Sequence, residues 1–329
     1  MELRLCGEYP NSTYIINNLV EDQILNGIGE GVVSRITLPS TNIVQGYLII
    51  LLSRDPTYTA FTKWKIALNN IILTREFKPH IDVQINEKLA HSLFIYDITK
   101  VINRDINLKI GYEGKKPMRV DAATLITIHR YNEFHLGFNC IVKIMNLNNS
   151  SINIPKTPLS FESTEKNLNI GIVSDKNSVL DLEIIGSINK KTSYNLFQGF
   201  NIIETQIERN LDIDSINIKC SNESPRHIFT CLFSLYSIYP RIDVKNIKVL
   251  EKDIMLTIYN NGDSSADEIE IILLRYGLQI YRSRIGSLKP GEEKLLTIPR
   301  NIIKANNAIA RIVWHKALRT FSRDLDIKL

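Results

Sequence analysis

Apolar and polar residues alternate with a period of two along most of the chain, which is the pattern of β-strands. In the segment 63–68 the alternating positions are Trp64, Ile66 and Leu68, which we expect to point into a core. The turn-forming pair Asn69-Asn70 and the apolar residues 71–73 follow, so this part of the chain is predicted to form a hairpin. A sustained apolar stripe with the helical period of 3.6 residues is hard to find. The sequence therefore predicts an all-β protein.

Two further segments support this prediction. Residues 43–52 (IVQGYLIILL) form the longest nearly apolar run, which is half the length needed to span a bilayer and is typical of a buried strand. Residues 106–110 alternate in the same way, and the polar loop 114–117 separates them from the apolar stretch 122–131. We therefore expect residues 106–131 to form a second hairpin and no segment to cross a membrane.

An internal resemblance indicates a duplication. The sequence INLKI (106–110), a polar loop and TLITIHRY (124–131) recur as INIKC (216–220), a polar loop and CLFSLYSIY (231–239). Upstream, residues 94–99 have a looser counterpart in residues 200–205. Because a repeated pattern indicates a repeated structural unit, we interpret this as two copies of one β-sandwich, against the alternative of a coincidence between Ile- and Asn-rich strands.

The boundaries of three domains follow from these copies. The first predicted domain, 1–136, and the second, 137–240, are related jelly-roll-like sandwiches. The third, 241–329, has predicted strands at 253–259, 269–276 and 278–284, with turns after Asn260 and at Pro290. About 90 residues with turns every 8–12 residues are typical of an immunoglobulin-like sandwich. The predicted fold class is thus all-β, with tandem antiparallel β-sandwiches, two jelly-roll-like units followed by an Ig-like sandwich.

The run IYNNGDSSADEIEIILLRYGLQIYRSRIGSLKPGEEKLLTIP (258–299) resembles the CARDB family of Ig-like modules. The matching features are Asn260-Asn261-Gly262, Ala266 and the strand to Tyr276, and the turn Gly286-x-Leu288-x-Pro290-Gly291-Glu292. The resemblance covers the last quarter of the chain and implies an Ig-like fold in a prokaryotic surface or adhesion protein. Its glycines at positions 262 and 291 are expected to adopt positive φ.

The first predicted domain resembles galactose-binding-like jelly rolls more loosely. The similar features are the strand Trp64 to Asn70, which ends in Asn-Asn where those proteins have Asn-Gly, and the step Tyr96-Asp97-Ile98-Thr99. This resemblance implies carbohydrate binding as an alternative function, by analogy of fold alone.

The net charge of +5 comes from the last segment of the chain. Residues 1–240 carry 24 charges of each sign, whereas residues 241–329 carry 16 basic and 11 acidic residues. We take four basic residues near the C-terminus as candidate contacts to an anionic partner, namely Arg311, Lys316, Arg319 and Arg323. The alternative is a solvated face with scattered ion pairs.

The four cysteines, Cys6, Cys140, Cys220 and Cys231, have neither the spacing of a zinc or redox site nor the density of a disulfide scaffold. If residues 220–231 form a hairpin, Cys220 and Cys231 can face each other in a disulfide, and buried free thiols are the alternative.

Catalytic and cofactor motifs are likewise missing from the sequence. No histidine pair has metal-ligand spacing, and no G-x-S-x-G elbow occurs. The acids that could act together in a glycosidase are Asp97, Asp121, Glu133, Asp181 and Glu183, but a sequence cannot pair them. We expect no catalytic, cofactor-binding or metal-binding residues.

These observations predict a non-enzymatic binding, adhesion or assembly protein that uses β-sandwich surfaces and loops to contact a protein or a glycan. The alternatives are a carbohydrate-binding or glycan-active protein and an intracellular protein that binds a polyanion, with nucleic acid not favoured. The N-terminus has no secretory signal pattern, which predicts a cytoplasmic location, whereas the CARDB resemblance implies the cell surface.

Overall fold

The computed structural model describes residues 2–27, 29–39, 42–57, 63–147, 150–154, 159–161, 163–187, 189–207, 213–220, 225–237, 239–262, 264–302, 307–316 and 319–328. Regular structure in these residues is β-sheet, apart from one 3₁₀ turn at Arg300–Ile302. The chain divides into two compact units, Met1–Ser237 and Ile238–Leu329. The predicted fold class of tandem antiparallel β-sandwiches is confirmed. None of the described helical residues forms a segment long and apolar enough to cross a membrane.

The first unit contains two repeats of the same sandwich. The first repeat consists of β1 (Leu3–Leu25), β2 (Glu30–Thr37), β3 (Ile43–Arg54), β4 (Lys63–Leu68), β5 (Ile71–Thr74), β6 (Ile81–Gln84), β7 (Ala90–Asp97), β8 (Asp105–Glu113) and the first half of β9 (Met118–Asn146). The second repeat consists of the second half of β9, β10 (Ser150–Asn153), β11 (Glu165–Ser174), β12 (Ser178–Gly186), β13 (Lys190–Leu196), β14 (Gly199–Ile207), β15 (Ile213–Cys220) and β16 (Arg226–Ser237).

The strand order of the two repeats is the same. The outer sheet of the first repeat has the order β2-β8-β4-β5, and that of the second has β10-β15-β12-β13. The inner sheets follow the paths β1-β9-β3-β7 and β9-β16-β11-β14. Residues 106–131 and 216–239, which resemble each other in sequence, therefore form equivalent strands, β8 and β9 in the first repeat and β15 and β16 in the second.

The predicted hairpin at residues 106–131 is wrong. Strand β8 pairs with β2 and β4 in the outer sheet, whereas β9 pairs with β1, β3 and β16 in the inner sheet. The loop at 114–117 carries the chain from one layer of the sandwich to the other. By contrast, the hairpin of β4 and β5 is confirmed, with Asn69 and Asn70 at φ of 50° and 66° in its turn.

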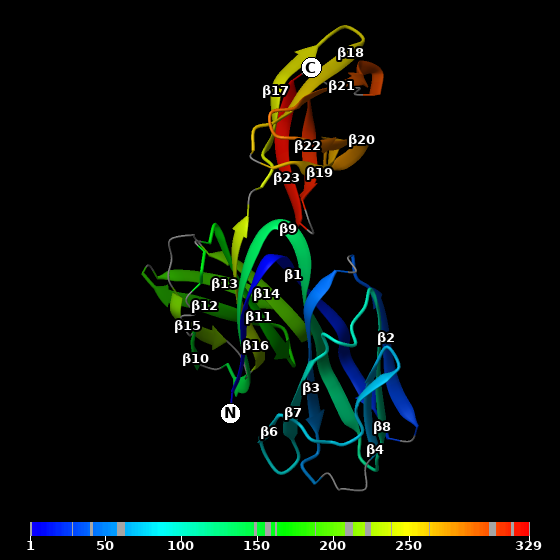
Figure 1. Ribbon diagram of the computed structural model, residues 1–329, viewed down its shortest axis with the longest axis vertical. Helices are drawn as coiled ribbons and strands as arrows, with labels where there is room; N and C mark the ends of the chain where they lie inside the picture. Colours follow the sequence, from blue (N-terminus) through cyan, green and yellow to red (C-terminus); the bar gives the residue numbers. More distant parts are fainter. Residues whose placement is uncertain are drawn as a thin grey trace. The chain divides into compact units, whose positions relative to one another are not determined.

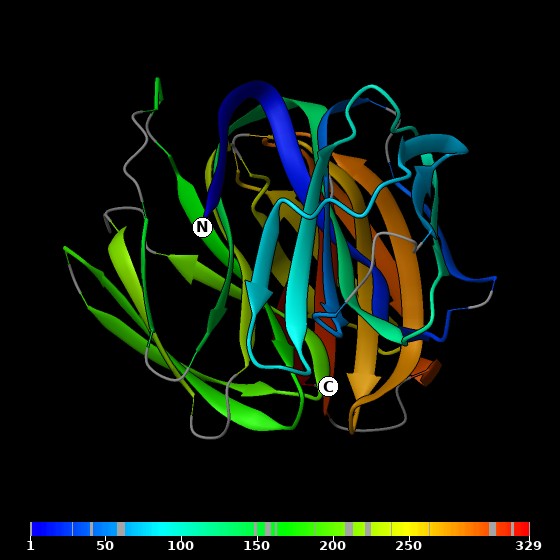
Figure 2. The same ribbon diagram turned by 90° about the horizontal axis from the view of Figure 1, so that it is seen from below.

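Strands β1 and β9 join the two repeats. Residues 118–129 of β9 pair with β3, residues 134–146 pair with β16, and β1 pairs with both halves of β9. The two strands form an arch whose legs reach the strands of the first repeat (blue to cyan) and of the second (green), which lie side by side in both views (Figures 1 and 2). The predicted boundary between residues 136 and 137 falls inside β9, so the first two predicted domains share one sheet.

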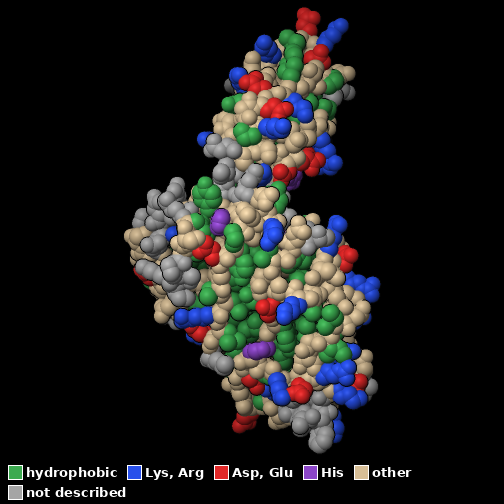
Figure 3. Space-filling model, in the orientation of Figure 1, with side chains coloured by type: hydrophobic (Ala, Val, Ile, Leu, Met, Phe, Trp, Pro, Cys, Tyr) green, Lys and Arg blue, Asp and Glu red, His purple; other side chains and the backbone are tan. Residues whose placement is uncertain are grey.

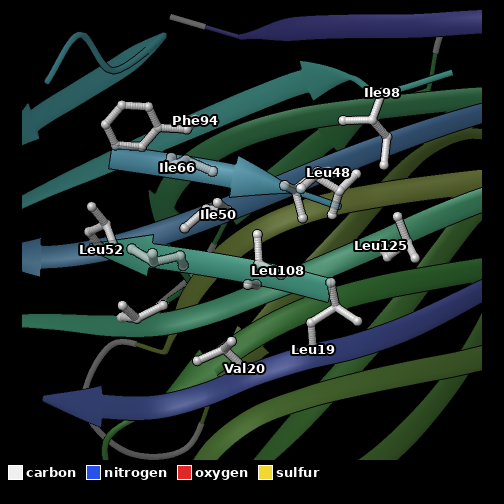
Figure 4. Close-up of a cluster of buried hydrophobic side chains, with 14 of the residues drawn as sticks. Leu19, Val20, Leu48, Ile50, Leu52, Ile66, Phe94, Ile98, Leu108 and Leu125 are labelled. Carbon is white, nitrogen blue, oxygen red and sulfur yellow. The ribbon is translucent and has the colours of Figure 1, made fainter. Parts of the chain in front are cut away.

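Each repeat has its own apolar core between its inner and outer sheets. In the first, Leu48 and Ile50 of β3 meet Ile66 of β4 and Leu108 of β8, as Figure 4 shows. Trp64 belongs to this core with 2% of its surface exposed, as its alternation with Ile66 predicts. In the second repeat an Ile- and Leu-rich cluster fills the equivalent space between β11, β12, β15 and β14.

The inner sheets of the two repeats are the two halves of the one sheet that β1 and β9 join, and these halves pack against each other. The residues of β3 between its core positions, Ile49 and Leu51, are also buried, on the opposite face of that sheet. There the ring of Tyr47 in β3 stacks on Phe138 in the second half of β9, with centroids 5.8 Å apart. Tyr14 of β1 stacks on Phe233 of β16 at 3.5 Å. The first unit is therefore four layers of sheet, and the β1–β9 arch connects its two middle layers.

The second unit is an Ig-like sandwich. Its strands are β17 (Ile242–Val249), β18 (Asp253–Asn260), β19 (Ala266–Arg275), β20 (Leu278–Leu288), β21 (Glu293–Pro299), β22 (Asn307–Lys316) and β23 (Arg319–Lys328). They form a sheet of order β17-β18-β21 and a sheet of order β20-β19-β22-β23 around an apolar core. Trp314 is inward-facing, as its alternation with Ile312 predicts, and its indole N–H donates to the carbonyl of Pro240 at 3.2 Å.

One expectation about the turns of this unit is wrong. Gly291 has φ of 74° as expected, but Gly262 is not in the positive-φ region. Gly262 is needed for space instead, because a Cβ there would lie 2.4 Å from the backbone nitrogen of Arg241. Asn260, two residues before Gly262, is fully buried, and its side-chain amide donates to the backbone carbonyls of Ser264 and Leu288.

Candidate functional site

A serine, a histidine and an aspartate, the residue types of a catalytic triad, meet in the first unit. Ser53 lies at the end of β3, His91 at the start of β7 and Asp121 in β9. The Ser53 hydroxyl donates to Oδ2 of Asp121 at 2.5 Å and lies 3.0 Å from Nδ1 of His91. A triad needs the aspartate on the histidine and the serine proton directed to the histidine. Here the serine proton is directed to the aspartate.

Burial also argues against catalysis by this group. Ser53, His91 and Asp121 are exposed by 7%, 2% and 2%. Burial lowers the pKa of His91 to about 4, and the nearby Arg226 adds to this effect, so the ring is neutral at pH 7. Burial raises the pKa of Asp121, whereas Arg226 and Arg119 oppose this shift. A substrate cannot reach these atoms without opening the sheet.

The surrounding charges connect the two repeats. Arg119 of the first repeat lies 2.7 Å from Asp121 and, across the junction, 3.2 Å from Asp175, which follows β11. Arg226 of β16 makes two contacts of 2.7 and 2.9 Å to Asp175 and, across the junction, lies 3.8 Å from Asp121. The cavity beside this cluster has a volume of about 10 Å³, too small for more than one water molecule. We conclude that the cluster joins the repeats and has a structural role.

An accessible polar groove lies on the outer sheet of the second repeat. Its volume is about 420 Å³, and its lining side chains come from β12, β13 and β15. The register sets this arrangement, because Asp181 lies opposite Ser193 and Lys219, while Glu183 lies opposite Lys191 and Asn217. Alternate residues of a strand share a face, so the two acids point into the same groove. Their neighbours Leu182 and Ile218 belong to the core.

Both acids of the groove are paired with polar neighbours. Ser193 donates to Asp181 at 2.7 Å, the Lys191 ammonium lies 3.1 Å from Glu183, and Asn217 donates to Glu183 at 3.4 Å. The hydrogen bond from Lys191, with a further one from Asn217, lowers the pKa of Glu183. A glycosidase acid needs a raised pKa so that it holds a proton at neutral pH. Glu183 is therefore an ionised hydrogen-bond acceptor.

The outer sheet of the first repeat carries a comparable groove. It has a volume of about 390 Å³ and is lined by residues of β2 and β8, including Arg35, Thr37, Asp105 and Asn107. Thr37 donates to Asp105 at 2.9 Å. Both repeats thus present a polar groove on the outer sheet, but only that of the second repeat contains two carboxylates from one strand.

The structure separates the other candidate acids. Asp121 is buried at the junction, and Asp97 accepts hydrogen bonds from Thr99 and Gln45 at the end of β7. The side chain of Glu133 lies outside the described residues. Of the five acids named from the sequence, Asp181 and Glu183 share one groove, and only the register could have identified their partners on β13 and β15.

Three of the four basic residues predicted to contact an anionic partner have an acidic neighbour. Arg311 pairs with Asp324 through two contacts of 2.7 Å, and Arg323 lies 2.7 Å from Asp243. Lys316 is 3% exposed and its ammonium lies 3.8 Å from Asp267. The side chain of Arg319 lies outside the described residues. On the face of residues 239–329 shown in Figure 3, acidic and basic side chains are interspersed.

Within the described ranges, no group of three or more His, Cys, Asp or Glu side chains could hold a metal ion. His129 and His227 are buried, and burial lowers the pKa of each to about 4. The cysteines are free thiols. Cys220 lies in the outer sheet and Cys231 in the inner sheet, so the hairpin that would have brought them face to face does not form.

The likenesses of this chain to known proteins are found among solved structures. No family model and no curated protein matches it. Among solved structures, the major capsid protein P2 of bacteriophage PM2 has a TM-score of 0.23 at 9% identity, over 68% of this chain and 98% of its own. The glycoside hydrolase domain of Endo-D from Streptococcus pneumoniae R6 has 0.21 at 8%, over 58% of this chain and 33% of its own.

The β-glucuronidase of Ruminococcus gnavus is similar at a TM-score of 0.21 and 10% identity, over 60% of this chain and 36% of its own. The chain thus spans about a third of the length of the two hydrolases. Likenesses at these TM-scores carry no argument about function. The fold itself defines the class, an all-β protein of tandem β-sandwiches.

Proposed function

We propose that this protein is a non-enzymatic binding protein that takes a carbohydrate ligand in the groove of Asp181 and Glu183. The observation that carries the proposal is the contrast between the two polar clusters of the first unit. The serine, histidine and aspartate that could react are buried and bonded to one another, whereas the accessible Glu183 pairs with Lys191 and the accessible Asp181 accepts from Ser193.

The chemistry of the groove fits a neutral polyhydroxyl ligand. Two carboxylates accept hydrogen bonds, and the ammonium groups of Lys191 and Lys219 and the amide of Asn217 donate them. A sugar hydroxyl both donates and accepts, so it can replace water between such neighbours without leaving a charge unpaired. The balance of two acids and two lysines favours a neutral glycan over a polyanion.

Binding to the full-length protein should be tested with a glycan array and then by calorimetry with the sugars that bind. We expect a Glu183→Gln, Asp181→Asn variant to bind at least about tenfold more weakly, because losing charge-assisted hydrogen bonds costs about 1.5–3 kcal/mol. The matched control is Lys63→Gln, Glu113→Gln, which removes an exposed pair 2.6 Å apart on the outer sheet of the first repeat. This control should bind as the wild type does.

Two results would contradict the proposal. An array without any bound glycan argues against a carbohydrate ligand. Hydrolysis of a bound glycan that disappears in the Glu183→Gln, Asp181→Asn variant shows instead that the groove is an active site.

A further inference from the structure

Cys140 and Cys231 are directly opposite each other in the inner sheet of the second repeat. The register of β9 and β16 pairs them, and it continues without a shift through Thr230 opposite Ile141 and Leu232 opposite Asn139. Directly opposed residues of antiparallel strands have Cα atoms about 4.5 or 5.5 Å apart. Both distances lie within the range of about 4.4–6.8 Å that disulfides require.

Both thiols point to the face where the two repeats pack together. Cys140 and Cys231 are 0% exposed, and the flanking residues Phe138 and Phe233 have ring centroids 5.3 Å apart on the same face. Burial raises the pKa of the Cys231 thiol, and its hydrogen bond to Cys140 adds to this shift. The folded protein therefore holds little thiolate at Cys231, and thiolate is the species that reacts with disulfides.

The other two cysteines are badly placed to compete. Cys6 of β1 lies opposite Asn139, so strand alternation directs its side chain to the face away from Cys140. Cys220 belongs to the outer sheet and packs in the core of the second repeat. Among the described cysteines, Cys140 and Cys231 are therefore the one pair that lies directly opposite on neighbouring strands.

We propose that Cys140 and Cys231 form a disulfide when the chain folds in oxidising surroundings and remain thiols when it folds in reducing ones. The oxidant is a small disulfide such as oxidised glutathione. One cysteine thiolate attacks it, forming a mixed disulfide and releasing one reduced glutathione, and the second cysteine displaces the other glutathione. The protein loses two protons and two electrons, and the oxidant becomes two thiols.

The consequence is a covalent link between the first and last strands of the second repeat. Cys140 belongs to the second half of β9, which begins this repeat, and Cys231 belongs to β16, which ends it. Closing almost the whole repeat into one loop restricts the unfolded chain and stabilises the folded one. This inference is independent of the proposed carbohydrate binding.

The test uses the full chain, unfolded and refolded either in a glutathione redox buffer or with excess reductant. Free thiols are then alkylated under denaturing conditions and counted by intact mass. We expect two of the four thiols to escape alkylation after oxidative refolding, all four to react after reducing refolding, and the oxidised protein to melt at the higher temperature. Peptide mapping should show the linkage of Cys140 to Cys231.

Matched variants separate this pair from the other cysteines. A Cys6→Ser, Cys220→Ala variant should lose both remaining thiols on oxidative refolding, whereas Cys231→Ala should leave Cys140 open to alkylation. Four reactive thiols after oxidative refolding, or a linkage through Cys6 or Cys220, would overturn the proposal. The peptide map of the wild-type protein decides the question even where a variant fails to fold.

Discussion

Arg226 of β16 and Asp121 of β9 lie 3.8 Å apart between Nη2 and Oδ1, with side chains exposed by 6% and 1%. One residue belongs to the second repeat and the other to the first, so this ion pair joins the two sandwiches across their buried junction. A buried charge without its partner is costly, because the lost solvation is no longer compensated. The junction therefore depends on both residues being present.

We predict that Arg226→Met destabilises the first unit by about 3 kcal/mol, because it leaves the buried Asp121 with Arg119 as its remaining cation. Urea unfolding followed by tryptophan fluorescence measures this in a Trp314→Phe background, where Trp64 of the first unit is the sole tryptophan. The control is Arg4→Met, which removes an exposed pair with Glu2 and should cost less than about 0.5 kcal/mol. Equal stability of the two variants would contradict the structural role of Arg226.

The first unit should lose stability between pH 6.5 and about 4. Burial lowers the folded-state pKa of His91, His129 and His227 to about 4, whereas an unfolded histidine titrates near 6.5. Between these values the unfolded chain binds more protons, so stability falls as the pH falls, and the effect is complete below about pH 4. Each histidine contributes about 1.4 kcal/mol for each pH unit in this window.

Urea unfolding of the Trp314→Phe protein at several pH values between 7 and 4 measures that slope. His91→Gln should decrease it, because this residue no longer takes up a proton on unfolding. A slope that stays unchanged in His91→Gln would show that this ring is already protonated in the folded protein.

The turn between β4 and β5 should respond oppositely to two neighbouring substitutions. Asn70 has φ of 66°, and glycine adopts this region more readily, so Asn70→Gly should stabilise the first unit by about 0.5 kcal/mol. Asn69 also has positive φ, but its side chain bonds the backbone of Asn107 and Val101, so Asn69→Gly should destabilise by about 1–3 kcal/mol. Two unfolding curves in the Trp314→Phe background measure both effects, and a shared sign would refute this account.

Gly262→Ala should destabilise the second unit by about 1–3 kcal/mol, because the added methyl group would meet the backbone of Arg241 at 2.4 Å. Unfolding in a Trp64→Phe background reports on this unit through Trp314. The control is Gly291→Ala, where nothing lies within 4 Å and only the φ of 74° opposes the substitution, at a cost of about 1 kcal/mol. A smaller loss for Gly262→Ala than for Gly291→Ala would contradict the steric account.

The sequence by itself determined the class of fold. Period-two alternation depends on each strand's own residues, so the spacing alone assigns Trp64, Ile66 and Trp314 to buried faces. The Asn69-Asn70 turn is equally local. The internal resemblance also indicated the repeated sandwich, because equivalent strands keep similar apolar patterns.

Only the tertiary structure decided which strands pair. Alternation is the same for a strand that turns back within its sheet and for one that crosses to the facing sheet, so β8 and β9 were wrongly expected to form a hairpin, and the hairpin considered for β15 and β16 does not form either. For that reason the sequence directed attention to Cys220 as the partner of Cys231, whereas the register places Cys140 there. The groove of Asp181 and Glu183 and the pairing of Arg311 with Asp324 likewise depend on contacts between strands, which a single strand's pattern does not contain.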